Sequence, residues 1–243
     1  MRCPLLLAAV LWSATVAGAQ EMPAGTVIPV MVTVTLDSAK AHVGQPITGK
    51  VMERVPLPGG ENIPEGAKVL GHVSLVIPAK AGAPASLALQ FDKIIAHGHE
   101  FSIRTSLRAL ASMMAVYEAQ VPFFEPDTTP RGAVMLAPVG GEAAFRPDNP
   151  EKSYRPVHFS GELAPGCGSR VDQDGGTGAL WVFSPYACGV YGFGNALVIV
   201  GERSAATEDS ILLGSKKNFS INAGSGWLLL VTPQASNAEA AAQ

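Results

Sequence analysis

The fold is decided by a stretch that reads GTVIPVMVTVTL and runs from Gly25 to Leu36. From Val30 onward it alternates with a period of two, with valine or leucine at even positions and methionine or threonine at odd ones. This alternation predicts a half-buried β-strand whose threonines face the wetter side, because successive side chains of a strand point to opposite faces. Pro29 has no backbone N–H to donate, so we expect this strand to lie at the edge of its sheet.

Similar segments follow along the chain and are separated by glycine, proline or aspartate. We predict further strands at 47–55, 69–77, 87–95, 101–107, 179–184, 195–201, 210–213, 218–222 and 226–232. Gly71 inside one of them predicts a bulge or a close approach of two backbones. The segment 63–67 (IPEGA) predicts a tight turn, and 78–84 predicts a loose loop. The expected fold class is all-β, a barrel or sandwich of short, mostly antiparallel strands.

One long insert interrupts this pattern at residues 109–190. Ala109–Ala119 (ALASMMAVYEA) consists largely of good helix formers and lacks Gly and Pro, which predicts a short helix. Residues 121–166 are rich in Pro and Gly and keep no period, so they predict a long insert loop. We therefore divide the rest of the chain into a first β part (20–108), closing strands (191–233) and a disordered tail (234–243).

Residues 1–19 have the pattern of a secretory signal peptide. Arg2 supplies a positive charge, an apolar run follows, and Ala17-Gly18-Ala19 fits a cleavage site, which makes Gln20 the expected first residue after cleavage. The apolar run is shorter than a typical membrane span, although an uncleaved anchor stays the alternative. We expect an exported chain, in the periplasm or associated with the outer membrane, without a transmembrane span after cleavage.

Two cysteines remain after that cleavage, Cys167 and Cys188. An exported chain meets oxidising conditions, so these two predict one disulfide. Neither lies in a recognisable metal-binding or catalytic motif, which disfavours a metal pair or a reactive thiol.

Composition excludes some classes of partner. Hydrophobic residues make up 47% and charged residues 15% of the chain, which predicts a folded core rather than global disorder. The net charge is −3, and no run of lysine or arginine is long enough to follow a phosphate backbone. We therefore expect no nucleic-acid partner.

Candidate site residues are few, and each has a plainer interpretation. His97 and His99 could chelate zinc or copper, but no third ligand can be identified in the sequence, so a solvated hairpin turn is the favoured interpretation. Aromatic residues in the second half could form a platform for a peptide or glycan, or a core for the insert; they are Phe123, Phe124, Tyr154, Trp181, Tyr186 and Tyr191. No Gly-x-Ser-x-Gly elbow is present. We assign no catalytic residue, metal or cofactor.

A family resemblance rests on the order of several motifs. They are GTVIP (25–29), GQPI (44–47), IPEGAKVLG (63–71), FDKII (91–95) and SINAGSG (220–226) followed by LLLV (228–231). In this order they resemble the periplasmic β-barrel domain of conjugation and type IV secretion core-complex proteins (TrbI-like), over about 24–108 and more weakly 210–232. The resemblance implies a barrel in a bacterial envelope. The chain departs from that family in its signal peptide and in its Pro/Gly-rich insert, which replaces an apolar helical hairpin.

Two functions follow as hypotheses. The first is an exported, non-enzymatic β-domain that acts as an envelope scaffold or assembly factor, alone or as an oligomer. Its strand edges and the 109–190 insert would bind an envelope protein or polymer. The second is an envelope hydrolase or transferase whose active residues converge from loops. Convergence of a histidine with a carboxylate or serine in a pocket would favour the second.

Overall fold

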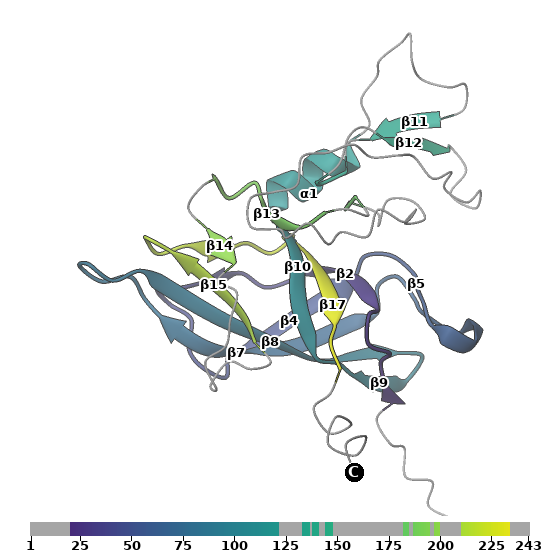
Figure 1. The fold of residues 1–243 in the computed structure, drawn as a ribbon, viewed down its shortest axis with the longest axis horizontal. Coiled ribbons are helices and arrows are strands. Elements are labelled where there is room, and N and C mark those ends of the chain that lie inside the picture. Colours follow the sequence, from purple (N-terminus) through teal and green to yellow (C-terminus); the bar gives the residue numbers. More distant parts are fainter. Residues whose placement is uncertain are drawn as a thin grey trace, which may run out of the picture.

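A computed structural model describes residues 20–121, 133–136, 138–140, 144–147, 182–184, 187–194, 197–199 and 210–233. In this part of the chain the structure is mostly β, with one large sheet and one short α-helix (Figure 1). The prediction of a β fold with mostly antiparallel strands is confirmed.

Eleven strands make up the large sheet. In chain order they are β1 (Gln20–Glu21), β2 (Val27–Val32), β4 (Pro46–Val51), β7 (Lys68–Ile77), β8 (Ala85–Ala96), β9 (His99–Ser102), β10 (Thr105–Ala111), β13 (Gly189–Tyr191), β14 (Val198–Ile199), β15 (Ile211–Ser215) and β17 (Gly226–Val231). Small pairs are formed by β3 (Leu36–Asp37) with β16 (Ser220–Ile221), β5 (Val55–Pro56) with β6 (Asn62–Ile63), and β11 (Ala133–Leu136) with β12 (Ala144–Pro147). The helices are a 3-10 turn, η1 (Pro58–Gly60), and α1 (Met113–Gln120).

The strand order of the large sheet is β1-β9-β8-β7-β4-β2-β17-β10-β13, and β15 pairs with β8 and with β14. Parallel pairing occurs between β1 and β9 and between β10 and β13, while the other neighbours are antiparallel. Among the described residues this order is open, since no pairing joins its two ends into a ring.

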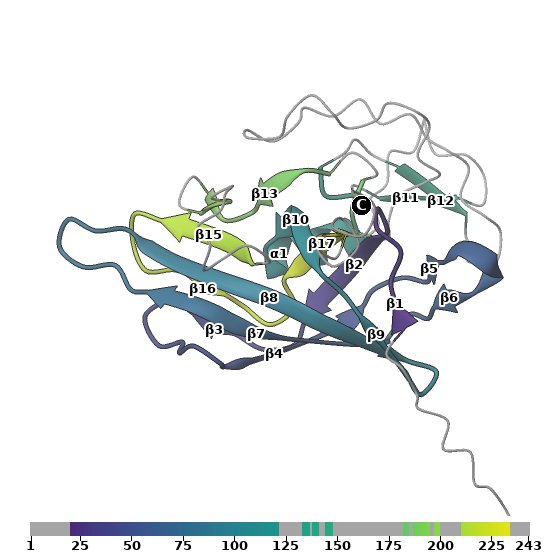
Figure 2. The same ribbon diagram turned by 60° about the horizontal axis from the view of Figure 1, so that its bottom comes forward.

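The strands β9 and β10 follow each other directly in the chain, but they lie near opposite ends of this strand order. Strand β9 pairs with β8, and β10 pairs with β17. Between the two strands, Ile103 N donates to Asp92 O at 3.0 Å, and Thr232 N donates to Arg104 O at 2.9 Å. Figure 2 shows the chain continuing from β9 at one end of β8 into β10, which crosses to lie beside β17. The sheet therefore curls around its inner face.

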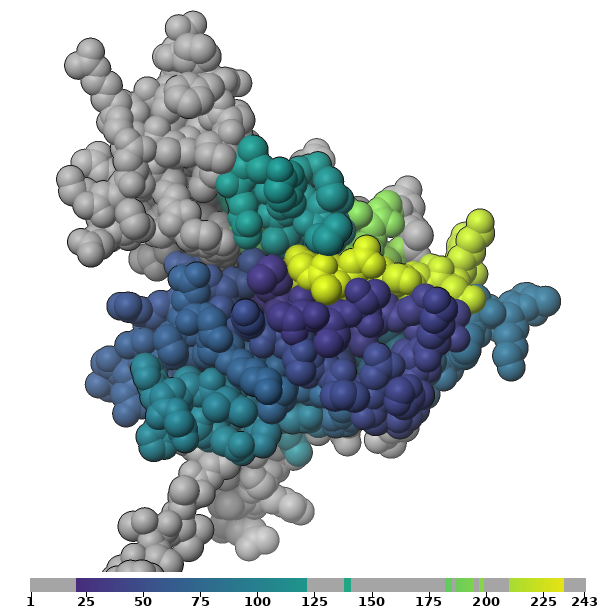
Figure 3. Space-filling model, turned by 180° about the vertical axis from the view of Figure 1, so that it is seen from behind, coloured from purple at the N-terminus to yellow at the C-terminus, as the bar shows by residue number. Residues whose placement is uncertain are grey.

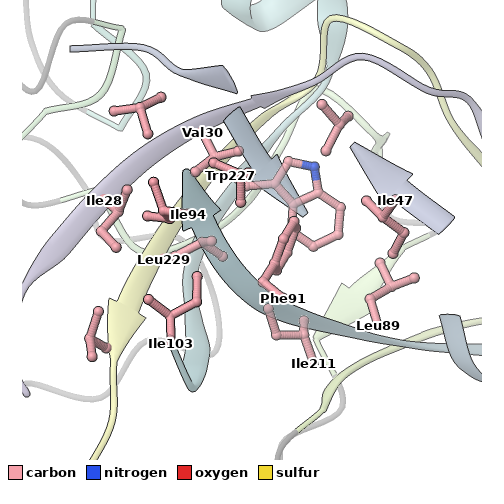
Figure 4. Close-up of a cluster of buried hydrophobic side chains, with 14 of the residues drawn as sticks. Ile28, Val30, Ile47, Leu89, Phe91, Ile94, Ile103, Ile211, Trp227 and Leu229 are labelled. Carbon is pink, nitrogen blue, oxygen red and sulfur yellow. The ribbon is translucent and has the colours of Figure 1, made fainter. Parts of the chain in front are cut away.

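The inner face of this curled sheet holds the main hydrophobic core. Trp227 of β17 meets Phe91 of β8 edge to face, with ring centroids 5.6 Å apart (Figure 4). The alternation predicted from the sequence is confirmed, because Val30 and Val32 are fully buried in this core while Thr33 is exposed. Full burial of a large apolar side chain stabilises a fold by about 1.5–3 kcal/mol, so this cluster is the main source of stability.

The prediction of an edge strand was wrong for β2, which lies between β17 and β4. Pro29 is tolerated because the ladder between β2 and β4 begins only at Val30 opposite Val51. Met52 N donates to the Pro29 carbonyl at 2.8 Å as β4 ends. Proline thus occupies the end of a ladder, where a missing N–H costs little.

Two further expectations need correction. Residues 109–111 belong to β10 rather than to the helix, which begins at Met113. The loop expected at 78–84 contains a tight turn, in which Lys80 and Ala83 exchange hydrogen bonds of 3.2 and 2.9 Å between their backbones. Gly82 at φ 81° supplies the left-handed conformation that such a turn requires.

Candidate protein-binding surface

Helix α1 is held on the outer face of the sheet by its N-terminal cap. The Ser112 hydroxyl accepts from Ala115 N at 3.2 Å, and Ser112 N donates to the Tyr191 carbonyl of β13 at 2.9 Å. A serine cap satisfies one of the N–H groups that the first helical turn leaves without a partner. The helix start is thereby fixed to both β10 and β13.

The inward side of α1 covers a second, smaller core. Val116 and Ala119 are buried there against Leu228 of β17 and Phe183. Gly226 of β17 makes this approach possible, because a Cβ at that position would lie 2.8 Å from Val116 Cγ2. Strand β17 is therefore buried on both faces, by the main core inside and by α1 outside.

The outward side of α1 exposes four large apolar side chains, which we call the α1 stripe: Met113, Met114, Tyr117 and Val121. Tyr117 is 61% and Met114 54% exposed. The spacing of 113, 117 and 121 places three of the four on one helical face. Glu118 is the one charged residue of α1. Figure 3 shows this teal segment at the molecular surface beside yellow residues of the C-terminal part of the chain.

A pocket of about 350 Å³ opens where the C-terminal end of α1 passes over β2 and β4. Its lining residues are Met31, Lys50, Val51, Met52, Glu65, Gly66 and Gln120. The two methionines give it a deformable apolar wall, and Lys50 and Glu65 give it one charge of each sign. Gln120 is the one residue of α1 that lines this pocket, and none of the α1 stripe residues does.

The sequence-predicted aromatic platform falls mostly outside the described residues. Phe123, Phe124, Tyr154, Trp181 and Tyr186 lie there. So does Cys167, and the disulfide proposed with Cys188 therefore stays a prediction.

Tyr191, the sixth aromatic candidate, ties β13 to the residues before it. Its hydroxyl donates to the Cys188 carbonyl at 2.8 Å and accepts from Cys188 N at 3.1 Å. Burial raises the pKa of this tyrosine above 10, opposed by the Cys188 hydrogen bond and by the nearby Arg108 charge. The side chain packs against the second core, which agrees with the interpretation of the aromatics as a core for the insert.

His97 and His99 lie at the hairpin between β8 and β9. His97 and Gly98 form its two-residue turn, both with positive φ, and both histidines are exposed. The predicted hairpin turn is confirmed. No group of three or more metal-ligating side chains occurs within the described residues.

One contact between a histidine and an aspartate was not predicted from the sequence. His72 Nδ1 lies 2.9 Å from Asp92 Oδ2 on the outer face of β7 and β8, and both side chains are partly exposed. Ser74, two residues along the same strand, shares a hydrogen bond of 2.8 Å with Ser210. The positions of the pair, 20 apart in sequence, offered no motif to find them by.

Within the described ranges no helix is long and apolar enough to cross a membrane. None of the protein families, curated proteins or solved structures compared with the chain matches it. The resemblance to secretion-channel barrel domains therefore rests on the motifs within 24–108 and 210–232.

Proposed function

We propose that the chain is an exported, non-enzymatic β-domain protein that acts as a scaffold or assembly factor in a bacterial cell envelope. Its partner is an envelope protein that presents an apolar helix to the α1 stripe. The observation that carries this proposal is the exposure of Met113, Met114, Tyr117 and Val121 on a helix anchored to the sheet.

We also propose that the curled sheet works as a barrel, as the family resemblance implies. Support comes from the segment 99–111, which pairs with β8 through β9 and with β17 through β10. A strand that bends between two distant neighbours is the element through which a small barrel closes. Such a sheet gives α1 a rigid base.

The chemistry of the α1 stripe favours a protein helix over a polysaccharide. Methionine and tyrosine are enriched at the cores of protein interfaces, where charged residues are depleted. A stripe that repeats every four residues fits the ridges and grooves of a second helix. A glycan would need convergent polar groups, and the stripe itself offers only the Tyr117 hydroxyl.

The test is site-specific photo-crosslinking in cells that make the chain naturally. A photoreactive residue replaces Tyr117, and the control places the same residue at exposed Glu61. The expected result is one crosslinked envelope protein from position 117, absent from position 61 and lost in a background of Met114→Asp. Position 114 lies in the first turn of α1, where a carboxylate suits the helix dipole, so this variant keeps the helix.

The captured protein is then purified to measure its affinity. Removing one central apolar contact costs about 1–2 kcal/mol, so Met114→Asp is expected to weaken binding roughly tenfold. Equal crosslinking from both positions, or an affinity that Met114→Asp leaves unchanged, would contradict the proposal.

The His72–Asp92 pair supports an envelope hydrolase as the second candidate. A carboxylate on Nδ1 holds an imidazole with Nε2 available as a base, as in triad enzymes. Under this hypothesis the purified chain would hydrolyse an envelope ester or peptide substrate, His72→Ala would abolish turnover and His42→Ala would not. No turnover in the unmodified chain, or turnover that survives His72→Ala, would reject it.

A further inference from the structure

The hairpin between β7 and β8 ends in a basic apex. We use this name for Lys80, Lys216 and Lys217 together with the exposed turn 81–84. Lys80 and Ala83 close the turn through their backbone hydrogen bonds. Figures 1 and 2 show this hairpin projecting from the body of the sheet and away from α1, and Figure 3 shows it in blue at the right edge.

The three lysines come from distant parts of the chain and are held together by specific contacts. Strand β15 pairs with β8 so that Ser215 lies opposite Ala85, which brings Lys216 beside the hairpin. Ala79 N donates to Asn218 Oδ1 at 2.7 Å, across 139 positions in sequence. Lys217 N also contacts Ser215 Oγ at 3.3 Å. The cluster is therefore a fixed part of the fold.

The surface between the lysines is small, hollow and without carboxylates. A shallow pocket of about 300 Å³ is lined by Lys80, Gly82, Ala83, Pro84 and Lys216. Neither 77–84 nor 214–219 contains Asp or Glu. At the base of the hairpin Ile77 is 44% exposed. The apex thus combines cationic side chains with small and apolar ones.

We propose that the basic apex docks on the surface of an anionic phospholipid bilayer. Lysine binds phosphate as a flexible point charge, and each lysine near an anionic membrane contributes attraction that salt screens. Lys80 and Lys216 line the same shallow pocket and Lys217 follows Lys216, so three exposed positive charges lie close together at this end of the sheet. Exposed apolar atoms at Ile77 and Pro84 fit the headgroup region.

A bilayer fits the apex better than a nucleic acid does. Single-stranded nucleic acids need aromatic side chains for base stacking along an extended basic groove. Phe219 is the one aromatic residue within 77–84 and 214–219, and it packs partly buried against the main core rather than lining a basic groove. The apex is also separate from the α1 stripe, so this inference holds or fails independently of the proposed partner helix.

The test measures binding of the purified chain to vesicles by flotation. The vesicles contain phosphatidylcholine alone or an equimolar mixture with phosphatidylglycerol. We expect binding to the mixed vesicles alone, weakening as salt is raised. Lys80→Glu combined with Lys216→Glu should reduce it at least about thirtyfold, since each reversal removes one attraction and adds a repulsion.

Two variants serve as controls. Arg54→Glu combined with Lys68→Glu makes the same change in net charge at exposed positions away from the apex, and should bind nearly as the parent does. Lys80→Arg combined with Lys216→Arg keeps the charge and should retain binding. Thermal unfolding of every variant checks that it is folded.

The proposal is overturned if both charge-reversed variants lose binding equally, because net charge alone would then explain it. Binding to phosphatidylcholine alone would overturn it as well. A third overturning outcome is lysine-dependent binding of soluble polyphosphate without any binding to mixed vesicles, which would make free phosphate the ligand.

Discussion

Gly71 provides the sharpest test of how the sheet is built. It lies in β7 where the register with β8 shifts, so that Leu70 faces Lys93, Gly71 faces Phe91, and Asp92 is the extra residue of a bulge. A Cβ added to Gly71 would fall well inside the van der Waals contact distance of the Gln90 carbonyl oxygen and would lie 3.0 Å from Phe91 Cα. Both obstacles are backbone, which cannot rotate out of the way.

The cost of Gly71→Ala follows from this geometry. The two strands would have to move apart by about 1 Å before the new methyl reached ordinary contact distance. Overpacking of this kind typically costs about 1–3 kcal/mol, and each ladder hydrogen bond that stretches adds about 0.5–1.5 kcal/mol. We expect a loss of about 3 kcal/mol, a large share of the stability of a domain of this size.

The assay is equilibrium unfolding in guanidinium chloride followed by tryptophan fluorescence, to which Trp181 and Trp227 both contribute, and by far-ultraviolet circular dichroism. Gly66→Ala is the control for an added methyl that meets no neighbour, since Gly66 lies in a turn at φ 81° and has no atom within 4 Å of the added Cβ, whereas Gly71 has no positive φ. Its expected cost is only the strain of a left-handed alanine, about 1 kcal/mol. If Gly71→Ala costs no more than Gly66→Ala, the close approach of β7 and β8 is refuted.

Three further changes test the caps and cores. Ser112→Ala removes the α1 cap and should cost about 1 kcal/mol in thermal unfolding; an unchanged midpoint would contradict the capping role. Trp227→Phe should cost less than about 2 kcal/mol in chemical unfolding, because the smaller ring leaves a cavity but removes an indole N–H that has no hydrogen-bond partner, and a loss above that would mean the N–H is satisfied. Tyr191→Phe should cost about 1–2 kcal/mol near pH 8 from its Cys188 hydrogen bonds. Because burial raises the Tyr191 pKa, that contribution is complete below the ordinary tyrosine pKa and is lost as pH rises through the raised pKa, so the difference between parent and variant should shrink at alkaline pH; a constant difference would contradict this.

Much of the sheet could be predicted because its signals are local. The alternation of Val30, Val32 and Leu36 marked the buried face of the decisive stretch, and Gly71 marked the bulge. Pro29 was misleading because its place in the sheet is not a local property. Whether Pro29 lies on an edge depends on where β4 and β17 end, and both partners are distant in sequence. Ala109 favours a helix by propensity, yet pairing with Leu228 outweighs that preference.

The candidate sites also differ in whether their residues are close together in sequence or are brought together only by strand pairing. The α1 stripe could have been found from sequence, since 113, 117 and 121 share a helical face once a helix is assumed. The basic apex could not, because Lys80 and Lys216 meet only through the pairing of β8 with β15. The His72–Asp92 contact likewise depends on the register between β7 and β8 and on the bulge that displaces Asp92.

The positions of β2 and β17 in the sheet explain why α1 leaves large apolar side chains exposed. Strands β2 and β17 lie at the centre of the sheet, and the inner sides of both are filled by the main core around Trp227. The outer sides need only a thin cover, which Val116 and Ala119 supply. A helix of eight residues is marginal by itself, so two buried residues leave α1 weakly stabilised. Four large apolar side chains remain about half exposed, and burying the rest of each against a partner would add about 1 kcal/mol per side chain. A helix bound at the α1 stripe, as proposed above, would supply α1 with the packing that its own sheet does not provide.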